Sequence, residues 1–403
     1  MLAVFDRRPR VPLELTLIIL EFISVARDWP TLAAFACTCR DYFRPARKLL
    51  FHEVSLRQHP HSAPMSTRDV SRRIKGLCGF LKKDSETRNH VQKFELLLDS
   101  HPVANDSEWI TQLPELVTLI DTLTNVRQCT FGCVLGFLDG RSLPPTLLAA
   151  LKRLLNQPHL KVLTLYNMSF PAAFLQTSAQ YLYVNNVHAA QRLPSDPDVA
   201  FPHSRLRYLN ARMVCLSSTC AVWHIMQIHA RSLKVMKWRC WEDPRSTVAW
   251  AYLPSDIDLG QMKALRKLVL RASFGAVARD LMQLHQILKN ITCASSLTAI
   301  ELDVSCPAQR TWFGLEDVER HQVWRLLAEV LSQTEYVGMR RIVVLLRVHD
   351  FKIIMPNETT STSVAEMQKR LGRSLRDFTN IPGIHFKYNV QPLLLDSIAV
   401  LQA

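Results

Sequence analysis

The sequence predicts an α/β chain in which a short N-terminal helical module precedes an irregular solenoid of alternating strands and helices with a curved parallel sheet. Two observations lead to this prediction. From Val11 to Phe51, apolar residues recur at the intervals of packed helices. Beyond that segment a short apolar pattern typical of a buried strand recurs, and the stretches between its copies have helical periodicity.

The composition is that of an ordered globular chain. Its 403 residues are 48% hydrophobic and 21% charged, a balance that supports a sizeable core and leaves no disordered tract. Met1 to Arg10 include charges where a secretory peptide needs an apolar run, and no long uncharged apolar stretch follows. We therefore expect a protein of the cytoplasm, the nucleus or both, neither secreted nor membrane-spanning.

Metal and cofactor motifs are missing from the sequence. The ten cysteines and fourteen histidines are scattered without a zinc-ligand spacing, and the 11 glycines form no phosphate-binding loop. We expect reduced thiols, no metal site and no cofactor. The same observation argues against a doubly wound enzyme domain, the main alternative fold, and local motifs assemble no nucleophile, base and orienting group.

The N-terminal module is predicted to contain three helices. The first begins at Val11-Pro12, because proline suits the first helical position, and runs to about Val25. The second extends from near Thr31 to Arg40, and the third begins at Pro45 and ends near Phe51. Apolar residues occupy more than one face of the first helix, so three short helices cannot bury them all. We expect a protein partner to cover the surplus.

Several residues of this module have the spacing of a known motif. They are Pro12-Leu13-Glu14-Leu15, Ile18-Ile19-Leu20, Leu32, Ala36 to Arg40, Phe43 and Arg44 to Phe51. The segment from about residue 11 to 56 resembles the F-box, in the variant found in large fungal F-box-like families, and residues 1–56 are assigned to this module. Phe43 stands where many members have tryptophan.

The F-box resemblance implies two partners, a Skp-type adaptor that contacts the module and a cullin scaffold that the adaptor joins. Carried over by position, the adaptor-binding residues are Pro12, Leu13, Ile18, Leu32, Cys39, Arg40 and Phe43. The alternative interpretation is an ordinary helical cap on the repeat body, which would remove the partner but not the helices.

Residues 57–403 are predicted to form a degenerate leucine-rich-repeat solenoid that binds a target protein. The repeat pattern is an apolar residue, two variable ones, an apolar residue, one variable and an apolar residue. Six segments are clear and begin at Leu160, Leu206, Leu233, Leu265, Leu297 and Val91. Three weaker segments begin at Val126, Ala179 and Met339.

Most gaps between these segments are predicted to be helices, which makes the strands parallel. The predicted helices are Thr67 to Lys83, Trp109 to Leu123, Thr146 to Gln157, Thr219 to Arg231, Val277 to Ile291, Glu316 to Ser332 and Val364 to Phe378. Proline-bearing stretches at Gln58 to Met65 and Gln191 to His203 are predicted to be loops.

The residues between buried strand positions define a candidate target site. The net charge is +14, and the segment from His203 to Trp250 contains eight Lys or Arg residues but only two acidic residues. Period-two alternation places six basic and aromatic side chains on one face of the sheet: Tyr166, Tyr183, Arg212, Lys237, Arg239 and Arg271. Arginine binds carboxylate and phosphate in a bidentate manner, so we expect an acidic or phosphorylated target. Val269, Glu301 and Asp303 are predicted on the same face.

Together these observations favour a non-catalytic substrate receptor of an SCF-type cullin-RING ubiquitin ligase. Two alternatives remain open: a scaffold without ligase function, and a basic nucleic-acid-binding protein. The basic balance and the tyrosine-arginine stripe motivate the nucleic-acid alternative, but the chain has no recognisable nucleic-acid-binding module.

Overall fold

The computed structural model describes residues 13–26, 28–38, 40–57, 67–99, 114–171, 174, 176–189, 204–240, 258–273, 277–290, 296–306, 323–333, 336, 338–349 and 360–393. The chain divides into two compact units, Met1–Thr164 and Leu165–Ala403. Within the described residues the fold is α/β, with twelve α-helices and an open sheet of twelve strands. The strand order is β1-β2-β3-β5-β6-β7-β8-β9-β10-β11-β12, with β4 beside β5, and every pair of known register is parallel.

All nine predicted strands are confirmed, and each begins two residues after the first apolar residue of its pattern. Their bounds are β2 Lys93–Asp99, β3 Gln128–Leu135, β5 Val162–Phe170, β6 Tyr181–Ala189, β7 Tyr208–Met213, β8 Val235–Cys240, β9 Lys267–Ser273, β10 Ala299–Cys306 and β11 Arg341–His349. Three further strands were not predicted: β1 Glu53–Arg57, β4 Leu138–Asp139 and β12 His385–Leu393. The predicted domain boundary between residues 56 and 57 falls inside β1, which pairs with β2.

The first unit begins with three helices, α1 Leu13–Val25, α2 Trp29–Thr38 and α3 Arg40–Leu50. Their small core contains Leu20, Leu32 and Ala46, each fully buried. The prediction that α3 starts at Pro45 is wrong, because the helix begins five residues earlier and contains this proline. The turn that precedes Pro45 packs against α2, where the Tyr42 ring lies 5.9 Å from that of Phe35, and such tertiary contacts can outweigh the cost of a proline inside a helix.

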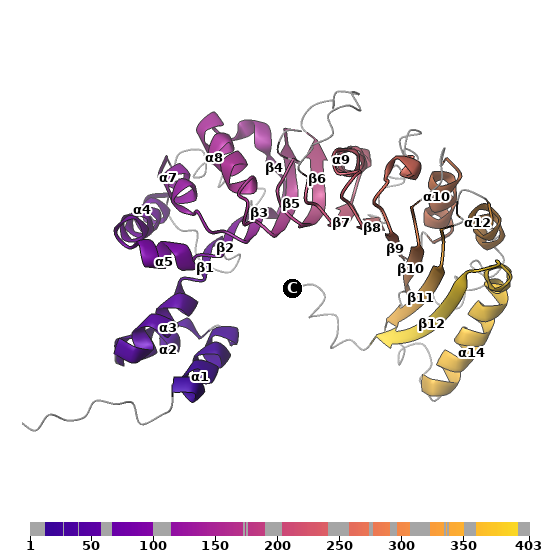
Figure 1. Cartoon of the computed structure of the whole chain (residues 1–403), viewed down its shortest axis with the longest axis horizontal. Coiled ribbons are helices and arrows are strands. Elements are labelled where there is room, and N and C mark those ends of the chain that lie inside the picture. The colour runs from indigo at the N-terminus through magenta and orange to yellow at the C-terminus, as the bar shows by residue number, and fades with distance from the viewer. Residues whose placement is uncertain are drawn as a thin grey trace, which may run out of the picture. The chain divides into compact units, whose positions relative to one another are not determined.

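The rest of the first unit is a layer of helices on one side of its strands (Figure 1). The helices are α4 Thr67–Lys83, α5 Ser85–His90, α7 Pro114–Thr122 and α8 Pro145–Leu155, with the short 3-10 helix η1 at Gly140–Ser142. The α4 helix has its predicted bounds, and it packs on α7, which packs on α8. Leu116, Leu119 and Leu151 are buried at these contacts, and Phe94 and Phe131 are buried on the strands. Burial of this apolar layer is the main stabilising contribution in the unit.

The second unit repeats the arrangement with α9 Leu216–Ile228, α10 Val277–Lys289, α12 Val323–Leu331, α14 Thr360–Ser374 and α15 Arg376–Thr379, and with the 3-10 helix η3 at Leu259–Gln261. The α9 helix packs against β6 and β7, α10 against α12, and α14 against β12. Trp238 was predicted to face the core and is 5% exposed. In this unit too the described helices lie on one side of the strands, and none of them covers the opposite face (Figure 1).

Some predictions fall on residues that the structure does not describe. The predicted loops Gln58 to Met65 and Gln191 to His203 lie outside the described residues. None of the helices that the structure does describe has both the length and the apolar character needed to cross a lipid bilayer.

Candidate interaction surfaces

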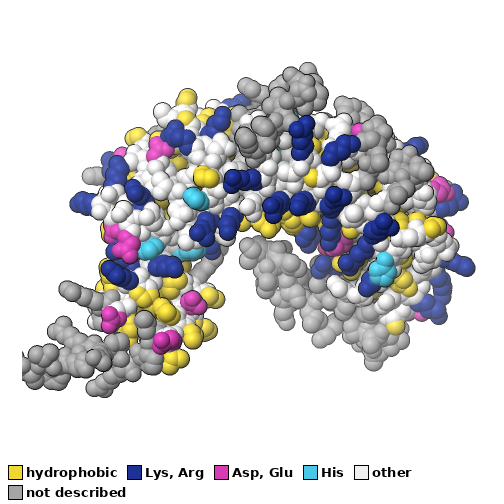
Figure 2. All heavy atoms as spheres, viewed as in Figure 1, with side chains coloured by type: hydrophobic (Ala, Val, Ile, Leu, Met, Phe, Trp, Pro, Cys, Tyr) yellow, Lys and Arg dark blue, Asp and Glu magenta, His cyan; other side chains and the backbone are white. Residues whose placement is uncertain are grey.

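The α1 helix presents an apolar face that no described part of the chain covers. The exposed fractions are 62% for Ile18, 74% for Phe22 and 83% for Val25, and Leu15, Leu17 and Ile19 are exposed as well. Among the side chains of this helix that the structure describes, only Leu20 and Thr16 are buried, because the three-helix core is small. Figure 2 shows hydrophobic side chains gathered on this module. Exposed apolar surface of this extent on one short helix is typical of a protein-binding site.

The structure sorts the seven predicted adaptor-binding residues into three groups. Ile18 is exposed, and Phe43 is 44% exposed, so both can contact a partner. Leu32 is fully buried between the helices and can only support the surface. The remaining four give no side-chain information: Pro12 and Cys39 lie outside the described residues, and so do the side chains of Leu13 and Arg40.

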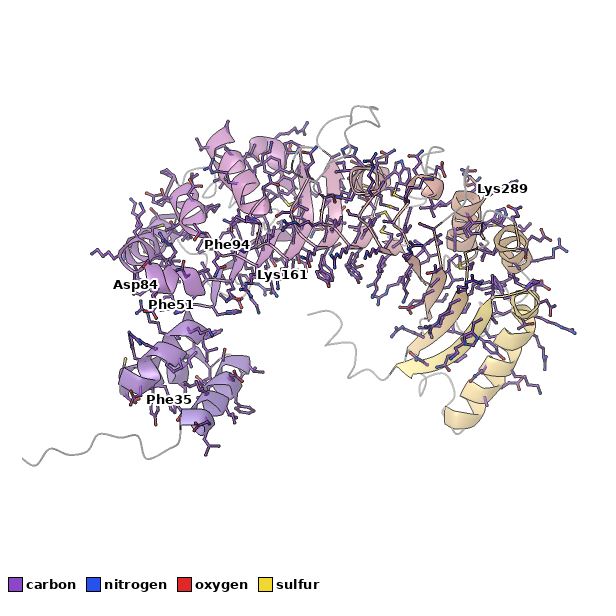
Figure 3. The ribbon with its side chains drawn as sticks, viewed as in Figure 1. Phe35, Phe51, Asp84, Phe94, Lys161 and Lys289 are labelled. Atoms are coloured by element: carbon purple, nitrogen blue, oxygen red, sulfur yellow. The ribbon has the colours of Figure 1, made fainter. Side chains whose placement is uncertain are left out.

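Arg47 of α3 holds the module against the helices that follow it. Its guanidinium lies 5.3 Å from the ring centroid of Phe43 and 5.7 Å from that of Phe80, and it forms an ion pair with Asp84. Phe51 stacks on Phe80 at 5.0 Å, close to Asp84 in Figure 3. Asp84 also caps α5, accepting a hydrogen bond from the Thr87 amide at 3.0 Å. These contacts use α3, and they leave the apolar face of α1 exposed.

On the helix-free face of the second unit, strand register aligns three predicted arginines. Arg212 on β7 lies opposite Arg239 on β8, which lies opposite Arg271 on β9. The next residue in line is Asp303 on β10. We call Arg212, Arg239 and Arg271 the arginine row. Neighbouring strands are about 4.8 Å apart, so the row is set by backbone hydrogen bonding and does not depend on side-chain rotamers.

The other predicted target residues lie next to this row. Tyr183 and Lys237 belong to the parallel line two residues earlier, with Asn210 between them. On β5, Tyr166 precedes Asn167, which accepts a hydrogen bond from Asn186 at 3.1 Å. Tyr166 on β5 therefore lies beside Asn185 on β6. Asn185 is in turn the register partner of Arg212. The structure thus brings all six predicted residues to one face.

The arginine row places positive charges next to one another on neighbouring strands. Burial first, and then the neighbouring guanidinium, lower the pKa of Arg212 and of Arg239 below the ordinary value, while Asp303 partly offsets this effect at Arg239. Burial and Arg271 likewise lower the pKa of Lys237. Like charges directly opposite each other on neighbouring strands are destabilising. A partly buried row of this kind can bind a carboxylate or a phosphate, which would offset the repulsion.

Asp303 ends the row and neutralises one side of it. Its carboxylate is only 6% exposed; it accepts a hydrogen bond from Arg347 Nε at 2.5 Å and pairs with Arg271 Nε at 3.1 Å. The sequence predicted that Asp303 faces outward with Glu301, which is half-buried and bridged to Lys267 at 2.6 Å. Both acids are therefore bound to the chain's own cations.

Val269 was also predicted to be exposed on this face, and that prediction is wrong, since it is 1% exposed. Its neighbours in the same line are Lys237 and Glu301, and the bridge from Glu301 to Lys267 lies next to it. Long charged side chains cover a small apolar one in this way.

Three tyrosines form a cluster at the β6 end of the face. The Tyr208 ring lies 5.9 Å from that of Tyr181 and 5.7 Å from that of Tyr183, and the Lys237 ammonium lies 5.6 Å from the Tyr208 centroid. Burial raises the pKa of Tyr183 and of Tyr208, so both remain neutral donors at physiological pH. Rigid aromatic groups beside cations are typical of binding hot spots.

A cysteine and a histidine that the sequence did not bring together meet at the start of α9. Cys215 Sγ lies 3.2 Å from His188 Nε2, and that nitrogen also lies 2.9 Å from the Asn186 side-chain oxygen. Burial would raise the pKa of the thiol, but hydrogen bonds from His188 and Ser218 lower it to about 7. Asn186 and the thiol compete for one ring nitrogen, so Asn186 does not orient the ring as a third member of a catalytic triad would. Cys215 and His188 are 27 positions apart in the sequence, too far for a local motif to indicate the pair.

Metal ligands do not gather in the described part of the chain, where no group of three His, Cys, Asp or Glu side chains is placed to hold an ion. Comparison with known proteins adds no assignment. No family model matches the chain, and no curated protein matches it significantly.

Proposed function

We propose that the chain is the substrate-receptor subunit of an SCF-type cullin-RING ubiquitin ligase, with α1 to α3 as an F-box-like module that binds a Skp-type adaptor and the repeat body as the target-binding part. The single observation that carries the proposal is the uncovered apolar face of α1. The resemblance of residues 11 to 56 to the F-box supports the choice of partner. In this role the chain does no chemistry and raises the local concentration of a target beside the transferring enzyme.

The α1 face is large enough to matter energetically. Burying one Ile, Val or Phe side chain completely stabilises by roughly 1.5–3 kcal/mol. Ile18, Phe22 and Val25 are each more than half exposed, so covering them yields on the order of 3–6 kcal/mol before the cost of association. A helical cap that only covers the repeat body has no need for these side chains.

A direct test is co-purification of the full chain with a purified Skp-type adaptor. We expect Ile18→Asp with Phe22→Asp to abolish binding, because two carboxylates would be buried in an apolar interface. The matched control is Met282→Asp on α10, an equally apolar side chain that is 44% exposed far from the module in sequence. If the unaltered chain fails to retain the adaptor, or if the double variant retains it as well as the control does, the ligase proposal is wrong and the scaffold alternative gains support.

The target is proposed to present an acidic or phosphorylated segment to the arginine row. The alignment of Arg212, Arg239 and Arg271 on neighbouring strands supports this choice, and the tyrosine cluster adds apolar contact area beside it. Charge reversal by Arg212→Glu with Arg239→Glu should abolish target capture from native cells while leaving adaptor binding intact. Unchanged capture would show that the arginine row does not bind the target, and it would leave the proposed adaptor-binding site unaffected.

A further inference from the structure

A second set of cations, separate from the arginine row, occupies the position immediately before four strands of the second unit. Arg207, Lys234, Arg266 and Arg340 precede β7, β8, β9 and β11, and all four side chains are exposed. We call these four residues the basic rim. Thr298 holds the same position before β10. Figure 2 shows Lys and Arg side chains gathered over this stretch of strands.

Backbone hydrogen bonds connect the basic rim as a continuous series from strand to strand. The amide of Lys234 donates to the carbonyl of Arg207 at 2.9 Å, and the amide of Arg266 donates to Lys234 at 2.8 Å. The series continues from Thr298 to Arg266 at 2.8 Å and from Arg340 to Thr298 at 2.9 Å. With strands about 4.8 Å apart, the rim is a line of about 19 Å along the sheet edge.

No residue that the structure describes neutralises these cations. Within the described residues, none of the four rim side chains forms an ion pair, and Arg266 donates only to the Ser296 carbonyl, at 3.5 Å. The neighbouring Lys267 behaves differently, because Glu301 bridges it at 2.6 Å. The rim therefore keeps its charge exposed to solvent, whereas the inner face partly neutralises its own.

The fold does not require a cation at this position. Gln180 stands there before β6 and Thr298 before β10, and both strands pair normally with the next one. An uncharged polar residue thus serves the backbone equally well. In the first unit the same position holds Arg127 and Lys161, both exposed, the second of which is labelled in Figure 3. A basic residue therefore recurs at the position before the strands although the sheet uses only the backbone groups there. This recurrence points to a ligand that binds the positive charge.

We propose that the basic rim binds an extended acidic segment, rich in Glu or Asp, of a partner protein. Charge complementarity supports an anion, and the line of about 19 Å matches six or so residues of extended chain at about 3.3 Å each. The proposal needs neither the adaptor nor the arginine row, so it stands or falls separately from the proposed ligase function.

The surroundings of the rim favour an acidic peptide over single-stranded nucleic acid. Binding of unpaired bases uses aromatic platforms on which they stack. The positions next to the rim on β8 to β11 hold Val235, Lys267, Ala299 and Arg341, and none of these is aromatic. Tyr181 and Tyr208 lie at the β6–β7 end only, where their rings pack against each other.

The test is fluorescence anisotropy of a labelled peptide of about eight glutamates with the full chain, at low and at high salt. The rim variant carries Arg207→Glu, Lys234→Glu and Arg266→Glu. The control variant carries Lys289→Glu, Lys369→Glu and Arg373→Glu, three exposed cations of α10 and α14 with the same total change in charge. We expect salt-sensitive binding that is about tenfold or more weaker in the rim variant and unchanged in the control.

Two results would overturn the proposal. Equal weakening in both variants would mean that the peptide responds only to net charge. A single-stranded oligonucleotide of equal charge that binds more tightly than the peptide, and that the rim variant loses, would assign the rim to nucleic acid. Circular dichroism of each variant shows whether folding is intact. If the rim variant fails to fold, the single changes Lys234→Glu and Lys289→Glu are compared instead. Lys234→Glu should then weaken peptide binding about threefold relative to Lys289→Glu.

Discussion

Replacing Asp303 by asparagine should lower the stability of the second unit and, at the same time, strengthen the binding of anions at the arginine row. The carboxylate is 6% exposed and bridges Arg271 and Arg347. Asparagine keeps the size of the side chain and one acceptor oxygen but removes the charge. The two effects have opposite signs, so simple damage to the fold cannot imitate both.

The loss of stability follows from the contacts of the carboxylate. Breaking a buried ion pair typically costs 3–5 kcal/mol. The two arginine side chains are 34% and 27% exposed, so water replaces part of the lost interaction, and asparagine retains one hydrogen bond. We therefore expect the free energy of unfolding to fall by roughly 2–3 kcal/mol. For a unit of this size the melting temperature should fall by about 4–10 °C.

The gain in affinity follows from Coulomb's law. An anion bound at Arg239 lies about two strand spacings, or about 10 Å, from Asp303. At effective dielectric constants between about 20 and 80, removing that negative charge favours a bound monovalent anion by about 0.4–1.7 kcal/mol. This corresponds to binding that is about two- to twentyfold tighter.

Differential scanning calorimetry measures the first effect, and titration of a singly phosphorylated peptide, monitored by anisotropy at fixed salt, measures the second. Glu301→Gln is a comparison that removes a half-buried acid from the neighbouring line and should destabilise less. If Asp303→Asn lowers the melting temperature but leaves the affinity for the phosphopeptide unchanged, the arginine row is not an anion site.

Three further predictions concern particular contacts. The rate of alkylation of Cys215 by iodoacetamide should rise with pH through a midpoint at about 7, because the thiolate is the nucleophile. His188→Ala should move that midpoint upward, and a midpoint that does not move would show that the histidine does not influence the pKa of the thiol. Gly372→Ala in α14 should not give the stabilisation of about 1 kcal/mol that alanine brings to a helix interior, because the added methyl group would lie 2.9 Å from Cζ of Tyr388 and nearer still to its hydroxyl. In a Tyr388→Ala background the same change should raise the free energy of unfolding, measured by thermal unfolding, by about that amount. Asp84→Asn keeps the cap of α5 but loses the ion pair with Arg47, whereas Asp84→Ala loses both. The free energy of unfolding in urea should therefore be lower for the alanine variant than for the asparagine variant by about 0.5–2 kcal/mol. Equal free energies would mean that the cap does not stabilise the helix.

Sequence periodicity predicts the interior strands of this protein well because they are buried on a regular pattern. The pattern that begins at Leu206 or Leu265 places its apolar residues against the helices, and the strand follows at a constant offset. The edge strands β1 and β12 escape this rule. In β12, His385, Lys387 and Asn389 are exposed, because a strand with one neighbour buries less of its surface and its apolar pattern is weak.

The candidate sites are less predictable because they depend on register and on charge pairing. Alternation places Arg212, Arg239 and Arg271 on one face, and the register confirms that they lie opposite each other. Alternation cannot show that Asp303 is buried by two arginines from different strands, since that depends on side-chain pairing. The basic rim escapes notice because its residues stand before the strands, where no periodic rule assigns a direction.

The placement of the basic rim before the strands makes its chemistry separable from folding. Its side chains contribute neither to the apolar layer nor to the sheet ladder, which uses only their backbone groups. Exchanging Lys234 or Arg266 for another polar residue therefore alters what the edge of the sheet attracts at little energetic cost. Mutational drift can retune the partner preference of such an edge, one strand at a time, while the architecture beneath it persists.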